Sequence, residues 1–280
     1  MIIWLASYPK SGNTWIRAFI STLLFSKDGI NDFSNLSKIR QFPNRDLFKN
    51  FVKNFQDPKE IYTNWKNAQD LINLDNKIKF FKTHHVNCEV ENFKFTDNDN
   101  SLGVIHIVRD PRTVLVSLKK HFKLNDFQKA KNIILNENSC VGFVKKDGNN
   151  KSLLNKVPTL IGSWGLNYLS WKNKIQNYLL IKYEDLVSNP NEEFYKISNY
   201  LEKLINCKFD KYKIDNAIKT TSFDNLQKLE KNGLFKEYEQ NMNFFHLGPK
   251  NNWKTQLDTK IVDEINIKFK NEMLELGYLK

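Results

Sequence analysis

The sequence predicts an α/β fold: a single domain with a central parallel sheet flanked by helices. The chain has 280 residues, of which 40% are hydrophobic, so it can form one large core. Short apolar runs alternate with segments of helical periodicity, and strands that alternate with helices pair in parallel through right-handed crossovers. Neither a Pro/Gly/Ser-rich linker nor a fixed-period repeat divides the sequence. One domain over residues 1–280 is therefore the simplest organisation.

Four short apolar runs are the predicted strands of this sheet. They lie at residues 2–6, 80–81, 104–108 and 178–182, and polar residues follow each of them. In open parallel sheets, ligands bind outside the carboxyl ends of the strands. We therefore expect the four polar clusters to converge on one crevice.

Helices are predicted between and after these strands. Apolar residues recur at helical spacing after Gly12, and Pro111 suits the first turn of a second helix. Two further helices are expected at about 160–174 and about 258–276, the second of which is amphipathic. This alternation of strands and helices is the basis of the parallel-sheet prediction.

Two Asn/Lys-rich segments, residues 32–76 and 124–158, have no clean period. Connections of this length in a compact domain are often lids or ligand-binding segments, and a solvated insertion without fixed structure is the alternative. The first segment contains aromatic residues that suit binding of a sugar or a hydrophobic small molecule and equally suit a small satellite core: Phe42, Phe48, Phe51, Phe55, Tyr62 and Trp65.

The chain carries a formal net charge of +12, which attracts anions such as nucleotides, sulfated or phosphorylated sugars, nucleic acid and membrane phosphate. The lysines are scattered, so charge by itself favours an anionic ligand only weakly.

The three cysteines have neither metal-like nor redox spacing, which is typical of reduced thiols in the cytoplasm. No run approaches the roughly 18 apolar residues of a spanning helix, so no integral membrane association is expected.

The first strand ends in the loop Tyr-Pro-Lys-Ser-Gly-Asn-Thr-Trp, residues 8–15, which opens a helix. Such a loop directs backbone N–H groups and the positive end of the helix dipole at one point, where an anion can bind. Gly12 allows close approach, and Lys10 and Thr14 add a charge and a hydroxyl donor. A nucleoside-triphosphatase loop has lysine after its second glycine, but Asn13 stands there. The loop is therefore of a phosphate-binding type that does not suit magnesium-nucleotide hydrolysis.

Together with four further motifs, this loop resembles the PAPS-dependent sulfotransferase family, particularly its cytosolic-type domain, from residue 2 to about residue 253. The other motifs follow in family order at residues 82–84, 107–117, 183–190 and 221–223. The resemblance implies a P-loop-like phosphosulfate-binding loop. It also implies 3′-phosphoadenosine 5′-phosphosulfate (PAPS) as co-substrate, with adenosine 3′,5′-bisphosphate as product. A sulfuryl group would pass to a hydroxyl or amine acceptor.

Carried onto this sequence, the resemblance implies three catalytic residues. Lys10 would contact the 5′-phosphosulfate, Lys82 would add positive charge beside the transferring group, and His84 would be the general base. An unperturbed imidazole has a pKa of about 6.5 and can accept a proton at neutral pH. Strand alternation turns the adjacent His85 to the opposite face.

The resemblance also implies a set of donor-binding residues. By this resemblance, Arg109 and Ser117 would bind the 3′-phosphate. Their separation of eight residues places one at the end of a strand and the other two turns along the following helix, where both can face one anion. Tyr183 would border the nucleoside. The full implied set is Lys10, Ser11, Gly12, Asn13, Thr14, Trp15, Arg109, Ser117, Tyr183, Thr221, Phe223, His246 and Gly248.

The sequence departs from the family pattern near its end. The family usually has an Arg-Lys-Gly element here, but His246 stands in the arginine position and Leu247 in the lysine position, before Gly248. A bidentate arginine contact with the 3′-phosphate is thus lost. Lys250 is a candidate to replace it as a point charge.

Two other functions stay open. A P-loop small-molecule kinase would depend on magnesium and would need the Gly-Lys-Ser/Thr element, which is absent. A non-catalytic nucleotide- or nucleic-acid-binding protein would use the positive charge but would not need Lys10 together with His84. We expect a small-molecule, carbohydrate or lipid-linked acceptor and no nucleic-acid partner. Because no carboxylates have metal-ligand spacing, no metal is expected.

Overall fold

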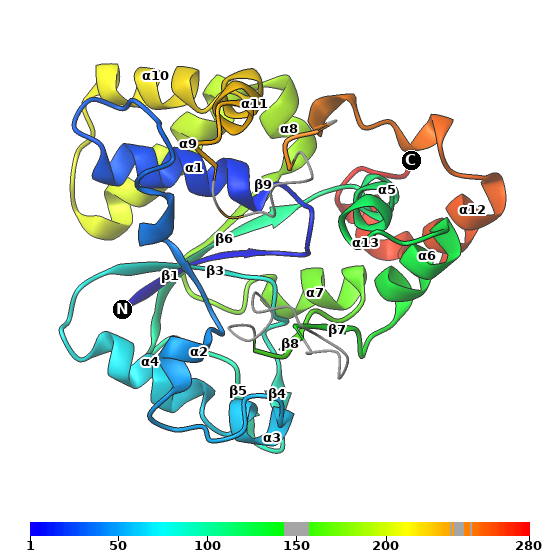
Figure 1. Ribbon diagram of the computed structural model, residues 1–280, viewed down its shortest axis with the longest axis horizontal. Coiled ribbons are helices and arrows are strands. Elements are labelled where there is room, and N and C mark those ends of the chain that lie inside the picture. Colours follow the sequence, from blue (N-terminus) through cyan, green and yellow to red (C-terminus); the bar gives the residue numbers. More distant parts are fainter. Residues whose placement is uncertain (143–156, 236, 238–243, 247) are drawn as a thin grey trace.

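The computed structural model describes residues 1–142, 157–235, 237, 244–246 and 248–280. Its central sheet has five parallel strands in the order β2-β3-β1-β6-β9 (Figure 1). This arrangement confirms the predicted α/β fold with a central parallel sheet. The strands are β1 (Ile2–Ser7), β2 (Arg40–Gln41), β3 (Lys79–Thr83), β6 (Ser101–Val108) and β9 (Tyr178–Lys182).

Helices form the rest of the regular structure, apart from two short antiparallel pairs, β4 (Glu89–Val90) with β5 (Phe93–Lys94) and β7 (Cys140–Val141) with β8 (Thr159–Leu160). The helices are α1 (Asn13–Phe25), α2 (Arg45–Phe48), α3 (Pro58–Tyr62), α4 (Trp65–Asn73), α5 (Pro111–His121), α6 (Phe127–Leu135), α7 (Trp164–Trp171), α8 (Tyr183–Ser188), α9 (Pro190–Ile205), α10 (Lys211–Thr220), α11 (Phe223–Lys231), α12 (Thr259–Lys268) and α13 (Lys270–Glu275).

Both faces of the sheet are covered. Helices α1, α9, α10 and α11 lie on one side, whereas α2, α3, α4 and α7 lie on the other (Figure 1). Helices α5, α6, α12 and α13 gather beyond the ends of the long strands β1 and β6 (Figure 1). Because a parallel sheet is buried on both faces, its strands are nearly continuous apolar runs.

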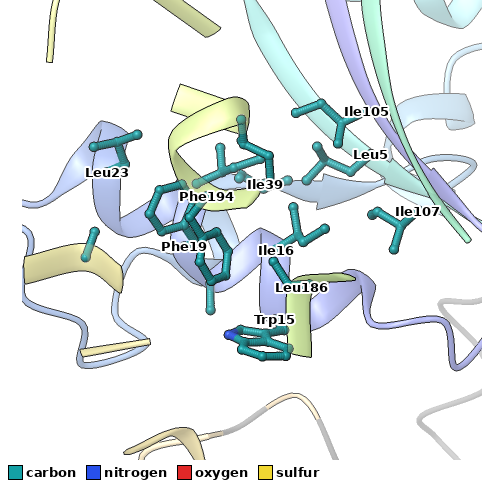
Figure 2. Packing of buried hydrophobic residues seen from close by; sticks show 14 of the residues in the cluster. Leu5, Trp15, Ile16, Phe19, Leu23, Ile39, Ile105, Ile107, Leu186 and Phe194 are labelled. Carbon is teal, nitrogen blue, oxygen red and sulfur yellow. The ribbon is translucent and has the colours of Figure 1, made fainter. Parts of the chain in front are cut away.

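Alternation along β1 divides its side chains between two cores. Ile3 and Leu5 pack on the α1 side, whereas Ile2 and Trp4 pack on the α4 side. On the α1 side, Leu5 and two isoleucines of β6 face side chains of α1 and α9 (Figure 2). The closest ring pair there joins Phe19 of α1 to a phenylalanine of α9, with centroids 4.3 Å apart. These apolar contacts fix α1 to the sheet and so orient the loop before it.

The segment 32–76 folds into β2 and three helices, α2 to α4. Most of its aromatic residues are part of the core on the α4 side, where Phe42, Phe48 and Trp65 are buried. The satellite-core interpretation of these aromatics is therefore the one that applies. In the second irregular segment, 124–158, α6 and β7 are formed, and residues 143–156 lie outside the described part of the chain.

Two predicted helices differ in detail. The helix expected at about 160–174 is α7, which begins only after the short strand β8. The C-terminal helix expected at about 258–276 is two helices, because the chain leaves helical geometry at Phe269, whose φ is −112° and ψ is 26°. Phe269 is buried against α7, so packing at this position takes precedence over a straight helix. Among the described residues, no helix is both long and apolar enough to cross a membrane.

Candidate active site

A cavity of about 930 Å³ opens at the carboxyl ends of the parallel strands. The residues after β1, β3, β6 and β9 all contribute to its wall, as do the second half of α5 and residues 244–246, 248 and 251. The polar clusters therefore do converge, because parallel strands end at the same edge of a sheet. The predicted site residues that line the cavity are Lys10, Gly12, Asn13, Thr14, Trp15, Lys82, His84, Arg109, Ser117, Tyr183, Phe223, His246 and Gly248.

The loop between β1 and α1 depends on glycine. Gly12 has φ +103°, and a Cβ atom there would lie 2.6 Å from Cδ2 of Tyr183. Asn13 begins α1 and donates from Nδ2 to the carbonyl of Leu5 (2.9 Å) and to the hydroxyl of Ser7 (3.1 Å). The Asn13 amide thus fastens the loop to β1. The free N–H groups of the first helical turn are then available to an anion.

Lys10 lies in this loop with a cationic environment around it. Its Nζ is 4.1 Å from the centroid of the Phe244 ring. Burial, together with the neighbouring charges of Arg109 and Lys120, lowers the pKa of Lys10 to about 8. An anion bound in the cavity would raise this pKa again, because it would favour the protonated amine.

His84 follows β3 and has a defined tautomer. Its Nδ1 lies 2.8 Å from the carbonyl oxygen of Ser7 and 3.2 Å from the hydroxyl of the same residue. A carbonyl can only accept, so Nδ1 carries the proton and Nε2 is the basic nitrogen. The backbone carbonyl of His84 accepts a bond of 3.0 Å from the amide of Asn167 on α7. Burial, followed by the charges of Lys82 and Lys10, lowers the pKa of His84 to about 4. The ring is therefore neutral at pH 7.

The adjacent His85 points away from the cavity, as strand alternation predicts. Its ring stacks on Phe95 at 4.4 Å and contacts Trp65 edge-on at 4.7 Å. Its Nδ1 lies 2.7 Å from the carbonyl of Val86. Burial lowers the pKa of His85 to about 4, so this histidine is a neutral part of the aromatic core.

Arg109, at the end of β6, is a buried cation with spare donors. Its guanidinium lies 3.9 Å from the centroid of the Tyr183 ring and donates to the carbonyls of Lys10 and Gly248, each at 3.1 Å. Only 5% of the residue is exposed, and its Nε has no partner in the described part of the chain. A buried N–H without a partner is costly unless a ligand accepts from it. The indole of Trp164 fixes the Arg109 backbone by donating to its carbonyl at 3.0 Å.

Ser117 lines the same cavity from α5. Its Oγ accepts from Nδ2 of Asn251 at 3.0 Å, and the same amide donates to the carbonyl of Thr113 at 3.2 Å. Because the oxygen of Ser117 accepts from Asn251, its own O–H can donate to a ligand.

Aromatic rings form one side of the cavity. The ring of Trp15 contacts those of Tyr183 and Phe223 edge-on, with centroids 6.1 Å and 6.3 Å apart. Gly248 has φ +46°, and a Cβ atom there would lie 2.0 Å from the Phe223 ring. The close approach of residue 248 to this ring therefore requires glycine, and the result is an aromatic surface beside the anion-binding groups.

Residues 2–277 match the sequence pattern of the sulfotransferase domain. The chain belongs to the sulfotransferase domain family. It is therefore an enzyme of the sulfotransferase class.

Individual relatives agree with this assignment. The chain is 24% identical to "Cytosolic sulfotransferase 13" of Arabidopsis thaliana, over 96% of this chain and 76% of the relative. It is 23% identical to "Flavonol 3-sulfotransferase" of Flaveria bidentis, over 94% and 79%. Among solved structures, mouse sulfotransferase SULT7A1 complexed with PAP is similar with a TM-score of 0.60 at 17% identity, over 97% of this chain and 84% of the other. At that identity the structural likeness shows the fold.

Two residues of the predicted donor-binding set do not line the cavity of this sulfotransferase. The side chain of Ser11 is fully buried. Thr221 is also fully buried, and its hydroxyl donates to the carbonyl of Ala217 at 2.6 Å, which places it in the end of α10. The hydroxyls of Ser11 and Thr221 are therefore buried within the fold and do not face the cavity.

The structure shows where the residues lie that depart from the family's Arg-Lys-Gly element. His246 is exposed at the cavity, and Leu247 lies outside the described residues. Lys250 is exposed and is not part of the cavity wall, whereas Lys120 is. Motif comparison missed Lys120, although its spacing of three residues from Ser117 on a helix would have indicated the same face. Gln41, from β2, also lines the cavity, and no sequence signal marked it.

Proposed function

We propose that this sulfotransferase transfers a sulfuryl group from PAPS to a hydroxyl or amine of a small-molecule or carbohydrate acceptor. The observation that carries the proposal is the meeting of three different groups at one cavity: Lys10 in an anion-binding loop, the neutral base His84, and the buried cation Arg109. This set matches the needs of sulfuryl transfer, which are positioning, charge neutralisation and a proton acceptor.

In this proposal the donor spans the cavity from the β1 loop to α5. The 5′-phosphosulfate lies at the N-terminus of α1 beside Lys10, and the 3′-phosphate lies between Arg109 and Ser117. The spare donors of Arg109 and the free O–H of Ser117 support this orientation. Tyr183 and Phe223 border the nucleoside. The complex of a structural neighbour with PAP, which is adenosine 3′,5′-bisphosphate, supports the choice of donor.

The transfer step is a substitution at sulfur. The acceptor oxygen or nitrogen attacks the sulfur while Nε2 of His84 takes its proton, and the bond between sulfur and the 5′-phosphate oxygen breaks. Lys10 and Lys82 stabilise the negative charge that develops on the leaving phosphate oxygen. The products are the sulfated acceptor and adenosine 3′,5′-bisphosphate. No residue in this scheme binds a metal.

The acceptor lies on the His84 side of the cavity in this proposal. The cavity wall also includes apolar residues after α5, in α6 and beside β7 and β8, namely Phe122, Leu124, Phe127, Val141 and Val157. An apolar wall beside a neutral base suits an aromatic or aliphatic alcohol. The relative named for a flavonol is a precedent for such an acceptor.

We place the reaction in the cytoplasm, in keeping with the relative that is named cytosolic.

Two measurements test the proposal. Thermal shifts with adenosine 3′,5′-bisphosphate, Mg·ATP and an oligonucleotide should show strong stabilisation by the bisphosphate alone. Incubation of a small-molecule extract with isotopically labelled PAPS should then yield a labelled product that mass spectrometry identifies. Preferential stabilisation by Mg·ATP would favour a kinase, and stabilisation by the oligonucleotide would favour a nucleic-acid-binding protein.

A further inference from the structure

The 3′-phosphate proposed beside Arg109 needs more positive charge than one guanidinium supplies. A phosphate monoester carries about −1.5 to −2 at pH 7. His246 stands in the arginine position, but burial and the charge of Lys120 lower the pKa of its imidazole, so it is a weaker source of positive charge than a guanidinium. Lys250 is exposed and does not line the cavity. The second cation must come from another element.

Lys120 is the residue in the right place. It lies on α5 three residues after Ser117, and positions i and i+3 share one face of a helix. Both residues line the cavity together with His246 and Asn251. Lys120 therefore lies near the place where α5 contacts Asn251.

Electrostatic coupling agrees with this position. The charge of Lys120 lowers the pKa of Lys10 and that of His246, so Lys120 is close to both sides of the cavity. Burial also lowers the pKa of Lys120 itself, and only Glu230 raises it. Like charges that repel one another across a cavity are stabilised when an anion enters between them.

We propose that Lys120 binds the 3′-phosphate of the donor together with Arg109 and Ser117, and supplies the charge that His246 does not. This inference rests on the proposed function, because it assigns a further residue to the donor site. Asn251 is a positioning residue in the same subsite, since its amide orients the Ser117 hydroxyl. The proposed subsite thus combines the buried guanidinium of Arg109, the neutral hydroxyl of Ser117 and the exposed ammonium group of Lys120.

The test compares two nucleotides that differ in the 3′-phosphate. Titration calorimetry with adenosine 3′,5′-bisphosphate and with adenosine 5′-monophosphate would be performed on the unmodified protein, Lys120→Ala and Lys120→Arg. Loss of a charged contact should weaken bisphosphate binding about tenfold in Lys120→Ala. Monophosphate binding should change less than about twofold, because that nucleotide lacks the group that Lys120 contacts. Lys120→Arg should restore most of the bisphosphate affinity.

Lys250→Ala is the matched control. It removes the same charge from an exposed lysine outside the cavity, so both affinities should stay as in the unmodified protein. Unchanged bisphosphate affinity in Lys120→Ala would overturn the inference, and equal losses for both nucleotides would instead assign Lys120 to the 5′-phosphate. If the unmodified protein bound neither nucleotide, or bound both equally, the proposed function itself would fail. A thermal unfolding scan of each variant confirms that it is folded.

Discussion

The cavity has two rims that are built differently. The strand rim consists of Lys10, His84 and Arg109, which follow β1, β3 and β6 and are fixed by hydrogen bonds to or from neighbouring backbone. The helix rim consists of the last turns of α5 with residues 244–246, 248 and 251, and Lys120 and His246 are exposed there.

This difference has a consequence for how each rim can vary. The position of a side chain on the strand rim is fixed by the register of its strand and by hydrogen bonds to particular backbone carbonyls. Few other side chains could make the same hydrogen bonds from the same positions. On the helix rim, a charge can move from one element to another and still reach the same part of the cavity. His246 stands where the family has an arginine, and Lys120 on α5 lines the same cavity, as expected if the charge has moved between elements. We therefore expect substitutions of Lys10 and His84 on the strand rim to affect turnover, and those of Arg109 and of the helix rim to affect donor affinity.

Lys10→Ala is expected to have the largest effect. Removal of the cation beside the leaving oxygen should lower kcat by about 10²–10³-fold, because that charge is needed most in the transition state. The fold should persist, since the loop is also fastened by Asn13. Steady-state assays with PAPS and circular dichroism would measure both outcomes. A variant with near-normal kcat would remove Lys10 from the mechanism.

His84→Gln should lower kcat on the order of a hundredfold or more, the usual contribution of a general base. Bisphosphate binding should stay nearly unchanged, because the base faces the acceptor. His85→Gln is the control: its ring lies in the aromatic core, so it should lower the melting temperature more than the rate. The opposite pattern, with His85 essential for turnover, would mean that the roles of the two residues are exchanged.

The pH dependence follows from the same groups. In the free enzyme, kcat/KM for the donor should rise with pH through about 4, where His84 loses its proton, and fall through about 8, where Lys10 loses its charge. The acid limb should disappear in His84→Gln. An acid limb near pH 6.5 in the free enzyme would show that His84 is more hydrated than its burial indicates.

Arg109→Ala should weaken bisphosphate binding about ten- to a hundredfold while kcat at saturating donor changes little. The 3′-phosphate does not change in the reaction, so its contact stabilises ground and transition states alike. Arg109 lies on the strand rim, but its proposed contact is with the 3′-phosphate of the donor. This variant therefore tests whether the effect of a substitution depends on the group that is bound or on the rim. A drop in kcat without a change in affinity would assign Arg109 to the reacting group instead.

Ser117→Ala should have the smallest effect, a loss of bisphosphate affinity of about three- to tenfold, because a neutral donor is lost rather than a charged one. Asn251→Ala should act in the same direction through the orientation of Ser117. In the double variant the two losses should be less than additive, because both act through one hydroxyl. Full additivity would mean that Asn251 contacts the donor directly.

Much of the site is readable from local patterns. The loop 8–15 predicts an anion site because a glycine, a lysine and a helix N-terminus stand in sequence, and no distant residue is needed for that conclusion. Alternation alone separates His84 from His85. In the same way, short apolar runs followed by polar clusters predict both the parallel sheet and the edge at which its ligands bind.

Other features depend on contacts between residues far apart in the sequence. The basic nitrogen of His84 is defined by the carbonyl of Ser7, and its lowered pKa results from burial among cations of other elements. Thr221 belongs to a recognisable motif, yet packing directs its hydroxyl into α10.

The sequence by itself determined four of the five strands of the central sheet, the sulfotransferase motifs and the candidate catalytic residues, because these are encoded in spacing along the chain. The short edge strand β2 was not predicted. Only the tertiary structure shows which of Lys120 and Lys250 lines the cavity with Arg109. Lys250 follows the altered Arg-Lys-Gly element in sequence but does not line the cavity, whereas Lys120 lines it from α5. Charge acts through distance in space, and the crossovers of a parallel sheet bring together residues that are more than a hundred positions apart.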